Sequence, residues 1–117
     1  MSTLKIYHNP RCSKSREALK LLEENGAQAE VIKYLDTPPN ENEIRNILQM
    51  LGISARDLMR TKEAIYKELN LKEVKNDDTL IKAMAEHPKL IERPIVIKDN
   101  KAVIGRPPVK VLDLLNA

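Results

Sequence analysis

The first third of the chain alternates between two kinds of apolar pattern, and this alternation restricts the fold more than any other feature. Residues 3–7 form a short strand-like run, residues 14–25 carry apolar positions at helical spacing, and residues 30–35 form a second strand-like run. Asn25 and Gly26 are a stop signal for the helix. A strand, a helix and a strand in this order predict a βαβ unit, whose right-handed crossover makes the two strands parallel.

The rest of the chain predicts a helical block followed by a hairpin and a last helix. Prolines break the pattern at residues 37–40, after which apolar residues recur at helical spacing up to about residue 88. Residues 95–98 and 102–104 are strand-like and flank turn-forming residues, and a helix then begins near the prolines that follow.

This order predicts an α/β protein with a thioredoxin-like fold. The hairpin can complete a mixed four-stranded sheet that helices cover. We expect one domain of residues 1–117, with a helical insertion at about 38–88. In the insertion, Ser54 is expected to cap a short helix, and Ile65 and Leu69 are expected on the buried face of the next one. Val109 is expected on the buried face of the last helix.

The only cysteine, Cys12, follows the first predicted strand and directly precedes the first predicted helix. A thiol at a helix N-terminus lies where unpaired backbone N–H groups and the helix dipole favour the thiolate. Arg11, Lys14 and Arg16 add positive charge nearby, and His8 supplies an imidazole that could pair with a thiolate. Cys12 is therefore a candidate nucleophile at the C-terminal end of a strand, where the active sites of βαβ units lie.

Simpler interpretations exist for these residues. A free cysteine is most often a small buried hydrophobe, and a single histidine is more often a surface residue or a satisfied core residue. The turn-forming and charged neighbours of Cys12 favour the reactive interpretation. Ser15 stands where a C-x-x-C motif would have its second cysteine, so a disulfide or adduct on Cys12 must be resolved by the thiol of another molecule.

Composition argues against several other classes of protein. A single cysteine excludes an internal disulfide framework and a multi-cysteine site, and no metal is expected. The net charge is +3 with both signs interleaved, and the chain has 3 tyrosines but no Phe or Trp, which argues against binding of nucleic acid. No apolar stretch is long enough to span a bilayer and no secretory signal is present, so we expect a cytoplasmic protein without a membrane partner.

Further motifs are spread over nearly the whole chain. The main ones are His8-Asn9-Pro10-Arg11-Cys12, Arg16, Met59-Arg60, Arg93-Pro94-Ile95-Val96 and Gly105-Arg106-Pro107. Between them lie Tyr34-Leu35, Pro38-Pro39, Gly52-Ile53-Ser54 and His87-Pro88. This set of motifs, in this order, resembles the glutaredoxin-coupled arsenate reductases, a family whose fold is thioredoxin-like with a helical insertion.

The resemblance implies a set of site residues. The family's cysteine nucleophile falls on Cys12, the histidine that helps to activate it falls on His8, and its three oxyanion-binding arginines fall on Arg60, Arg93 and Arg106. Guanidinium groups suit this role because they bind a tetrahedral oxyanion through paired, charge-assisted hydrogen bonds. Taken singly, Arg60 near a predicted helix end is more often a solvated surface residue, whereas Arg93 and Arg106 each directly precede a proline at the predicted hairpin.

The resemblance also implies a reaction. The Cys12 thiolate attacks the arsenic of bound arsenate, glutathione adds to the adduct, glutaredoxin removes the glutathionyl group, and arsenite leaves. Arsenate or a similar oxyanion, glutathione and glutaredoxin are thus the expected partners, no cofactor is expected to stay bound, and we expect a monomer. The proline at position 94 matches a proline that follows a cis peptide bond in thioredoxin-like folds, so we expect a cis Arg93-Pro94 bond.

Two departures from the family leave other functions open. Arg11, Ser13 and Lys14 stand where the family's reductases typically have small, uncharged residues, and the chain ends at Ala117, soon after the last predicted helix. We therefore expect a shorter branch of the family, and its physiological substrate need not be arsenate. The alternatives are a transcription-regulator-like adaptor that binds RNA polymerase and a glutathione-dependent thiol transferase. The arginines, together with Ser15, favour an enzyme.

Overall fold

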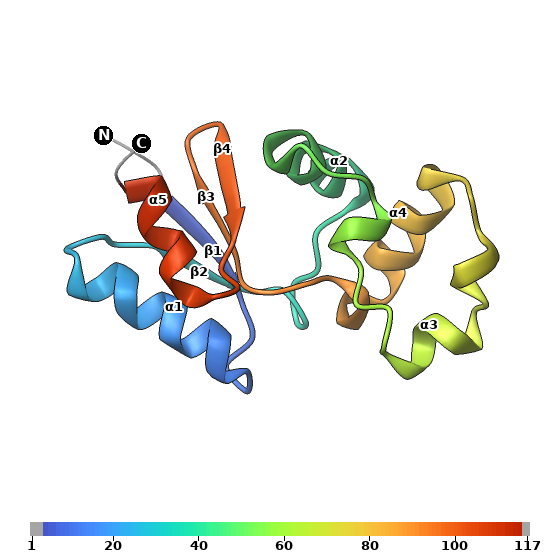
Figure 1. Cartoon of the computed structure of the whole chain (residues 1–117), viewed down its shortest axis with the longest axis horizontal. Coiled ribbons are helices and arrows are strands. Elements are labelled where there is room, and N and C mark those ends of the chain that lie inside the picture. The colour runs from blue at the N-terminus through green and yellow to red at the C-terminus, as the bar shows by residue number, and fades with distance from the viewer. Residues whose placement is uncertain (1–3, 116–117) are drawn as a thin grey trace. The chain divides into compact units, whose positions relative to one another are not determined.

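The computed structural model describes residues 4–115, which form two compact units (Figure 1). The sheet unit contains the chain up to Thr37 and from Arg93 onward, and the helical unit is Pro38–Glu92. Thr3, the first residue of the first predicted strand, lies outside the described residues. The prediction of a single domain over residues 1–117, which also reaches beyond the described range, stays a prediction.

Within residues 4–115, the sheet unit contains four strands. They are β1 (Leu4–His8), β2 (Glu30–Lys33), β3 (Ile95–Lys98) and β4 (Lys101–Ile104). Their order across the sheet is β2-β1-β3-β4. β1 pairs with β2 in parallel and with β3 in antiparallel fashion, and β3 and β4 form an antiparallel hairpin. The predicted mixed four-stranded sheet is confirmed.

Two helices cover one face of this sheet. α1 (Ser13–Glu24) follows β1, and α5 (Val111–Leu115) follows the short 3-10 helix η4 (Pro108–Lys110). Figure 1 shows α1 and α5 on the same side of the strands. Their buried side chains pack with strand residues into one core, which consists of Leu4, Ile6, Ala18, Leu22, Val96, Val111 and Leu114. Alternate residues of a strand share a face, so Leu4, Ile6 and His8 lie on the face of β1 that α1 covers.

β2 is shorter than predicted. The strand was expected over residues 30–35, but it ends at Lys33, whose carbonyl accepts hydrogen bonds from the N–H groups of Asp36 (2.9 Å) and Thr37 (2.9 Å) in a turn. The register explains this, because Lys33 pairs with His8, the last residue of β1. Beyond that pair, β1 offers no further ladder partner.

The C-terminal segment also differs from the prediction. Val109 was expected to be buried, but it lies in η4 with 56% of its surface exposed. Val111 and Leu114 are the buried residues of α5. The prediction assumed one regular helix from the prolines onward. The 3-10 turn of η4 has fewer residues per turn than an α-helix, so Val109 does not lie on the buried face of α5.

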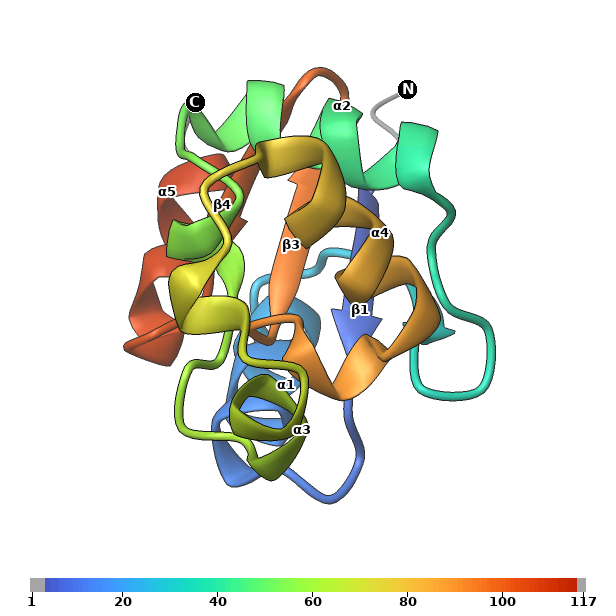
Figure 2. The same cartoon turned by 90° about the vertical axis from the view of Figure 1, so that its right-hand side faces the viewer.

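The helical unit holds the remaining elements. They are α2 (Glu41–Leu51), η1 (Arg56–Leu58), α3 (Ala64–Glu68), η2 (Leu71–Glu73), α4 (Asp77–Glu86) and η3 (Pro88–Leu90). α2 begins with a capping box in which Asn40 and Glu43 exchange side-chain-to-backbone hydrogen bonds, and it ends at Gly52, whose φ of 68° is left-handed. α2 and α4 pack together within this unit (Figures 1 and 2).

An arginine organises the middle of the helical unit. The guanidinium group of Arg56 donates hydrogen bonds to the hydroxyl of Tyr66 (2.5 Å) and to the carbonyls of Leu71 (3.2 Å) and Val74. These hydrogen bonds connect η1 with α3 and with both ends of η2. They also provide the Tyr66 hydroxyl with a partner inside the unit, which lets the ring be buried.

Two expectations about this region are wrong. Leu69 is 43% exposed and Ile65 is only partly buried, whereas Tyr66 is the buried residue of α3. Ser54 does not cap η1 with its side chain, since the residue at the cap position is Ala55 and Ser54 instead accepts a hydrogen bond from Asp57 N–H (3.1 Å) through its carbonyl. Helices as short as α3, with 5 residues, and η1, with 3, contain too few residues for periodicity to identify their buried face.

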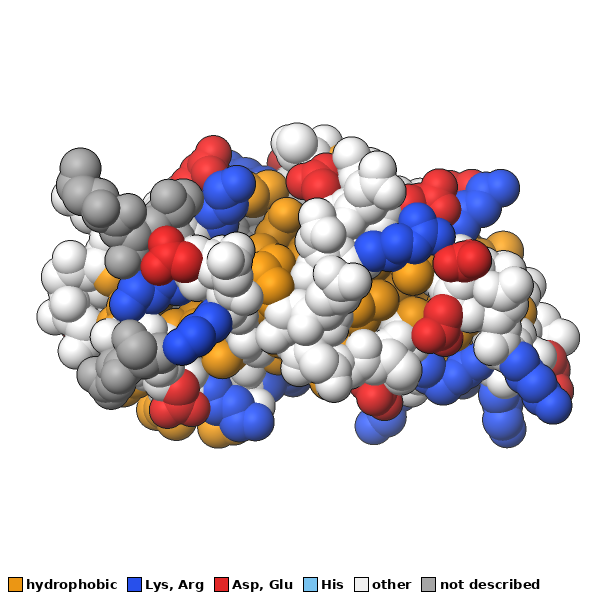
Figure 3. Space-filling model, turned by 90° about the horizontal axis from the view of Figure 1, so that it is seen from above, with side chains coloured by type: hydrophobic (Ala, Val, Ile, Leu, Met, Phe, Trp, Pro, Cys, Tyr) orange, Lys and Arg blue, Asp and Glu red, His pale blue; other side chains and the backbone are white. Residues whose placement is uncertain are grey.

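The surface carries both signs of charge. Figure 3 shows Lys and Arg side chains interspersed with Asp and Glu side chains on the face seen there, as the interleaved sequence predicts. Among residues 4–115, no helix has both the length and the apolar character needed to cross a membrane. Within the same range, His, Cys, Asp and Glu side chains do not gather in groups of three or more that could hold a metal ion.

Candidate active site

The strand register brings three loops of the sheet unit to one end of the sheet. Tyr7 near the end of β1 pairs with Ile95 at the start of β3, and Ile95 pairs with Ile104 at the end of β4. The loop between β1 and α1, residues 93–94 and residues 105–107 therefore leave the sheet at the same end. Cys12, Arg93 and Arg106, which the sequence analysis selected, belong to these three loops.

Cys12 is the residue at the N-terminal cap of α1. Its backbone is extended (φ −96°, ψ 122°), its N–H donates to the carbonyl of Asn9 (3.0 Å), and its carbonyl accepts the first helical hydrogen bond from Arg16 N–H (3.0 Å). The side chain is partly exposed and makes no capping hydrogen bond, and the first turn of α1 contains no acidic residue. The sulfur therefore lies at a helix N-terminus whose first amides precede the helical ladder, an arrangement that attracts anions.

The loop before Cys12 is held by its own side chain. The carboxamide oxygen of Asn9 accepts a hydrogen bond from the N–H of Arg11 (3.0 Å), which is the pattern of an Asx turn. Together with the bond from Cys12 N–H to Asn9 O, this contact defines the path from the end of β1 to the start of α1. A short, hydrogen-bonded connection fixes the direction of the cysteine relative to the sheet.

His8 is bonded to a serine. The imidazole is 6% exposed, and its Nδ1 lies 2.7 Å from the hydroxyl oxygen of Ser15 in the first turn of α1. Ser15 is fully buried and also accepts a hydrogen bond from Asn9 N–H (3.1 Å). Because Ser15 occupies Nδ1, only Nε2 of His8 is left for an interaction with Cys12 or with a bound anion.

The surroundings of His8 favour the neutral imidazole. Burial lowers the pKa of His8 below its ordinary value, and the positive charges of Lys33 and Arg16 lower it further. Lys33 is the neighbour of His8 in the β1–β2 register, and Arg16 lies one residue after Ser15 in α1. These effects favour the uncharged imidazole at neutral pH.

Arg93 and Arg106 lie close to each other on neighbouring loops. The Nη1 atom of Arg106 is 3.4 Å from the carbonyl oxygen of Arg93, to which it donates, and Gly105 N–H donates to the carbonyl of Pro94 (2.8 Å). Two guanidinium nitrogens of Arg93, Nε and Nη1, are buried, whereas Arg106 is exposed. The cis Arg93-Pro94 bond is confirmed, and Arg106-Pro107 is cis as well, which was not predicted.

Gly105 is a point of close approach behind these loops. A Cβ atom at this position would lie 2.9 Å from Cγ of Pro94, 3.1 Å from Cγ1 of Val111 and 3.4 Å from Cβ of Ala18. The absence of a side chain thus lets the loop after β4 pack directly on the proline that follows Arg93 and on both covering helices.

Arg60 belongs to the helical unit. Its N–H donates to the carbonyl of Leu90 (2.7 Å), next to the bridge between Met59 and Ile91, and this short ladder fixes its backbone. Its guanidinium group lies 3.7 Å from a carboxylate oxygen of Glu63 and 3.9 Å from one of Glu92. The other four selected residues belong to the sheet unit. The role of Arg60 at the oxyanion site stays a prediction.

The contact between Ser15 and His8 was not predicted from the sequence, in which Ser15 is only the position where a second cysteine is absent. The signal that could have found it is its phase, because Ser15, Ala18 and Leu22 are the buried residues of α1 and share one helical face. A polar residue inside an apolar stripe requires a hydrogen-bond partner, and the inward series of β1 ends at His8.

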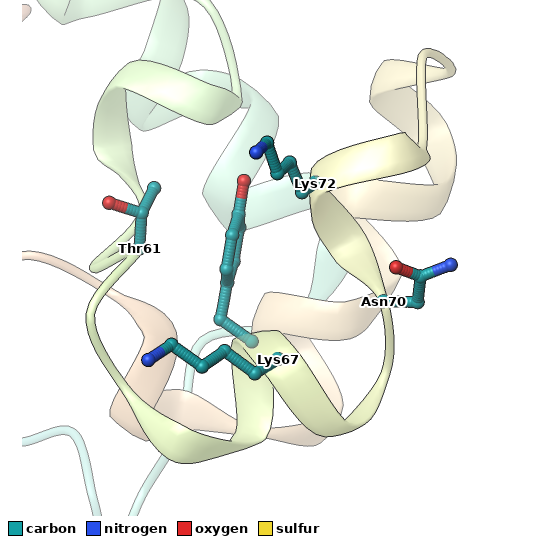
Figure 4. Close-up of a pocket in the computed structure, with 5 residues that line it drawn as sticks. Thr61, Lys67, Asn70 and Lys72 are labelled. Carbon is teal, nitrogen blue, oxygen red and sulfur yellow. The ribbon is translucent and has the colours of Figure 1, made fainter.

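A separate cavity of about 480 Å³ opens in the helical unit. Its lining consists of Thr61, Tyr66, Lys67, Asn70 and Lys72. Figure 4 shows the side chains of Lys67 and Lys72 extending toward the side on which Thr61 lies, while Asn70 points the other way. The candidate residues of the sheet unit do not take part in it.

The comparison with known proteins identifies the family. Residues 7–114 match the ArsC family. The chain belongs to the ArsC family. Among its relatives, an arsenate reductase of Neisseria meningitidis is 57% identical over 109 residues, which cover 92% of this chain and 93% of the relative. The Escherichia coli protein named YfgD, described as uncharacterized, is 56% identical over 114 residues, which cover 96% of each chain.

A solved structure agrees with this membership of the ArsC family. An arsenate reductase from Vibrio cholerae superimposes with a TM-score of 0.92 at 55% identity, and the match covers 95% of this chain and 96% of the other. The predicted thioredoxin-like fold and the resemblance to arsenate reductases are both confirmed. The names of these relatives favour the enzyme over the adaptor and thiol-transferase alternatives.

Proposed function

We propose that this chain is an arsenate reductase-like oxidoreductase in which Cys12 is the nucleophile. The observation that carries the proposal is the position of Cys12 at the N-terminus of α1, on the same end of the sheet as the loops of Arg93 and Arg106. It is supported by relatives that are named arsenate reductases and are more than half identical over most of the chain.

The first chemical step forms a sulfur–arsenic bond. The Cys12 thiolate attacks the As(V) of arsenate, and one arsenate oxygen leaves as water or hydroxide. The guanidinium groups of Arg60, Arg93 and Arg106 bind the remaining oxygens, and the helix N-terminus stabilises the negative charge. His8 assists through the imidazole nitrogen that Ser15 leaves free.

The second half of the reaction uses thiols from other molecules, because Cys12 is the only cysteine of the chain. Glutathione displaces a second oxygen from arsenic. The glutaredoxin thiolate then attacks the glutathione sulfur, and the electron pair of the broken sulfur–arsenic bond reduces As(V) to As(III). Water displaces arsenite from Cys12, which regenerates the enzyme. The reaction needs no resident metal or cofactor.

The experiment is arsenate-dependent NADPH consumption by the purified protein with glutathione, glutaredoxin and glutathione reductase. Cys12→Ser should reduce the rate to background, because the nucleophile is lost. Arg60→Lys should raise the KM for arsenate about tenfold, because an ammonium group cannot make paired hydrogen bonds. Arg45→Lys is the matched control, since Arg45 is an ion-paired arginine of the same unit that bonds to Asp78 on the surface.

Two results would contradict the proposal. Turnover retained in the Cys12→Ser variant would move the nucleophile to another molecule. Equal KM values for Arg60→Lys and Arg45→Lys would remove Arg60 from the oxyanion site. If the wild-type protein shows no arsenate turnover but reduces small glutathione mixed disulfides at a Cys12-dependent rate, the thiol-transferase alternative is correct.

A further inference from the structure

The hydroxyl of Ser15 has a defined hydrogen-bonding geometry. Its side chain is fully buried in the first turn of α1, and its oxygen accepts a hydrogen bond from Asn9 N–H (3.1 Å). The same oxygen lies 2.7 Å from Nδ1 of His8. A serine hydroxyl has one hydrogen to donate, and a backbone N–H can only donate. The hydrogen of Ser15 is therefore available for His8.

The direction of this bond determines where His8 carries its proton. A neutral imidazole has one N–H nitrogen and one acceptor nitrogen. If Ser15 donates to Nδ1, that nitrogen is the acceptor and the hydrogen must be on Nε2. The separation of 2.7 Å is typical of a strong bond to a hydroxyl. Burial and the charges of Lys33 on β2 and Arg16 on α1 lower the pKa of His8, which favours the neutral ring.

We propose that Ser15 is a positioning residue that fixes His8 in the Nε2–H tautomer, so that the imidazole acts at the Cys12 site as a hydrogen-bond donor and not as a base. The proposal rests on the proposed function and adds a named role for a residue of α1. An Nε2–H group can donate to the thiolate or to an oxygen of the bound anion. It cannot take the thiol proton, which must then leave to solvent or to the anion itself.

The local structure explains why serine suits this position. Ser15 lies on the buried face of α1 with Ala18 and Leu22, and its side chain is fully buried. The hydroxyl also provides a partner for Asn9 N–H at the end of β1. One small side chain thus links the last inward residue of β1 to the first turn of the helix that carries Cys12.

The direct test is the tautomer of His8, measured by long-range ¹H–¹⁵N correlation NMR on protein labelled at histidine, at a pH near 7.5. The chain has 2 histidines, so a His87→Gln variant assigns the spectrum. We expect wild-type His8 to carry its hydrogen on Nε2, and Ser15→Ala to convert it to a mixture of tautomers. A hydrogen on Nδ1 in the wild-type protein would overturn the proposal. The measurement on the wild-type protein does not depend on whether a Ser15 variant folds or on whether the protein reduces arsenate.

A double-mutant cycle separates positioning from a purely structural role. In the coupled assay, Ser15→Ala should lower kcat/KM for arsenate about tenfold when His8 is present and should have no further effect in a His8→Gln background. Ser15→Thr, which keeps the hydroxyl, should restore the Nε2–H tautomer. Equal effects of Ser15→Ala in both backgrounds would mean that Ser15 does not act through His8. If the wild-type protein lacks turnover altogether, the proposed function fails while the NMR result still decides the tautomer.

Discussion

Replacing Gly105 with alanine inserts a methyl group into space that other atoms already occupy. The new Cβ would lie 2.9 Å from Cγ of Pro94 and 3.1 Å from Cγ1 of Val111. Carbon atoms in favourable contact are about 3.5–4.0 Å apart, so the Pro94 ring must move by roughly 0.6–1 Å. The backbone of Gly105 is outside the left-handed region, so the cost comes from crowding alone. Overpacking of this kind costs about 1–3 kcal/mol, and we expect a loss of about 2 kcal/mol in the free energy of unfolding.

The assay is equilibrium unfolding in urea, followed by circular dichroism because the chain has no Trp. Gly52→Ala is the comparison variant, since a Cβ at Gly52 meets no atom within 4 Å and its cost comes only from the left-handed φ of 68°. Adding Val111→Ala to Gly105→Ala removes one of the crowding atoms. The double variant should then be more stable than the sum of the two single effects by about 0.5 kcal/mol or more.

The result that would refute this reasoning is a Gly105→Ala variant as stable as the wild type, or strict additivity with Val111→Ala. Either would mean that the loop after β4 adjusts without displacing Pro94. We also expect a functional effect. Arg93, a residue of the candidate oxyanion site, directly precedes Pro94, so a shift of Pro94 should also move Arg93. Gly105→Ala should therefore raise the KM for arsenate, while Gly52→Ala should leave it unchanged.

Two further predictions concern Arg56 in the helical unit and His8 in the sheet unit. Arg56→Met should destabilise the protein by about 2–3 kcal/mol in urea unfolding, because it removes charge-assisted bonds to Tyr66 and to two carbonyls, and an unchanged unfolding midpoint would contradict this. The pKa of His8 is lower in the folded protein, so the unfolded chain binds the imidazole proton more readily. The contribution of His8 to stability is therefore complete above about pH 6.5, and it is lost as the pH falls through the folded-state pKa. The difference in unfolding free energy between the wild type and His8→Gln should thus decrease from about pH 7.5 to about pH 5, and a pH-independent difference would be evidence against a buried neutral imidazole.

The parts of the fold that could be predicted from sequence are those with enough regular residues to show a period. β1 and α1 are long enough to reveal their apolar spacing, and the stop signal at Asn25 and Gly26 agrees with the observed end of α1 at Glu24. The hairpin of β3 and β4 was also predicted, because turn-forming residues separate two apolar runs. For Cys12, the sequence neighbours alone were sufficient to predict a helix N-terminus.

The parts that were missed depend on contacts between residues distant in sequence. Tyr66 is buried because Arg56, 10 positions earlier, hydrogen-bonds to its hydroxyl, and no local pattern encodes that bond. Ser15 and His8 are 7 positions apart and meet only because β1 and α1 pack face to face. The end of β2 depends on where its partner strand stops. Each of these is a tertiary effect that overrides local propensity.

The hairpin carries Arg93 and Arg106 just beyond its open end, and its closed end is the turn at Asp99 and Asn100, where Asp99 has a left-handed φ of 56°. Each strand of 4 residues spans about 13 Å, so the turn and the arginines lie at opposite ends of the hairpin. A peptide tag or a spectroscopic label inserted between Asp99 and Asn100 would therefore lie at the end of the hairpin opposite the candidate oxyanion site.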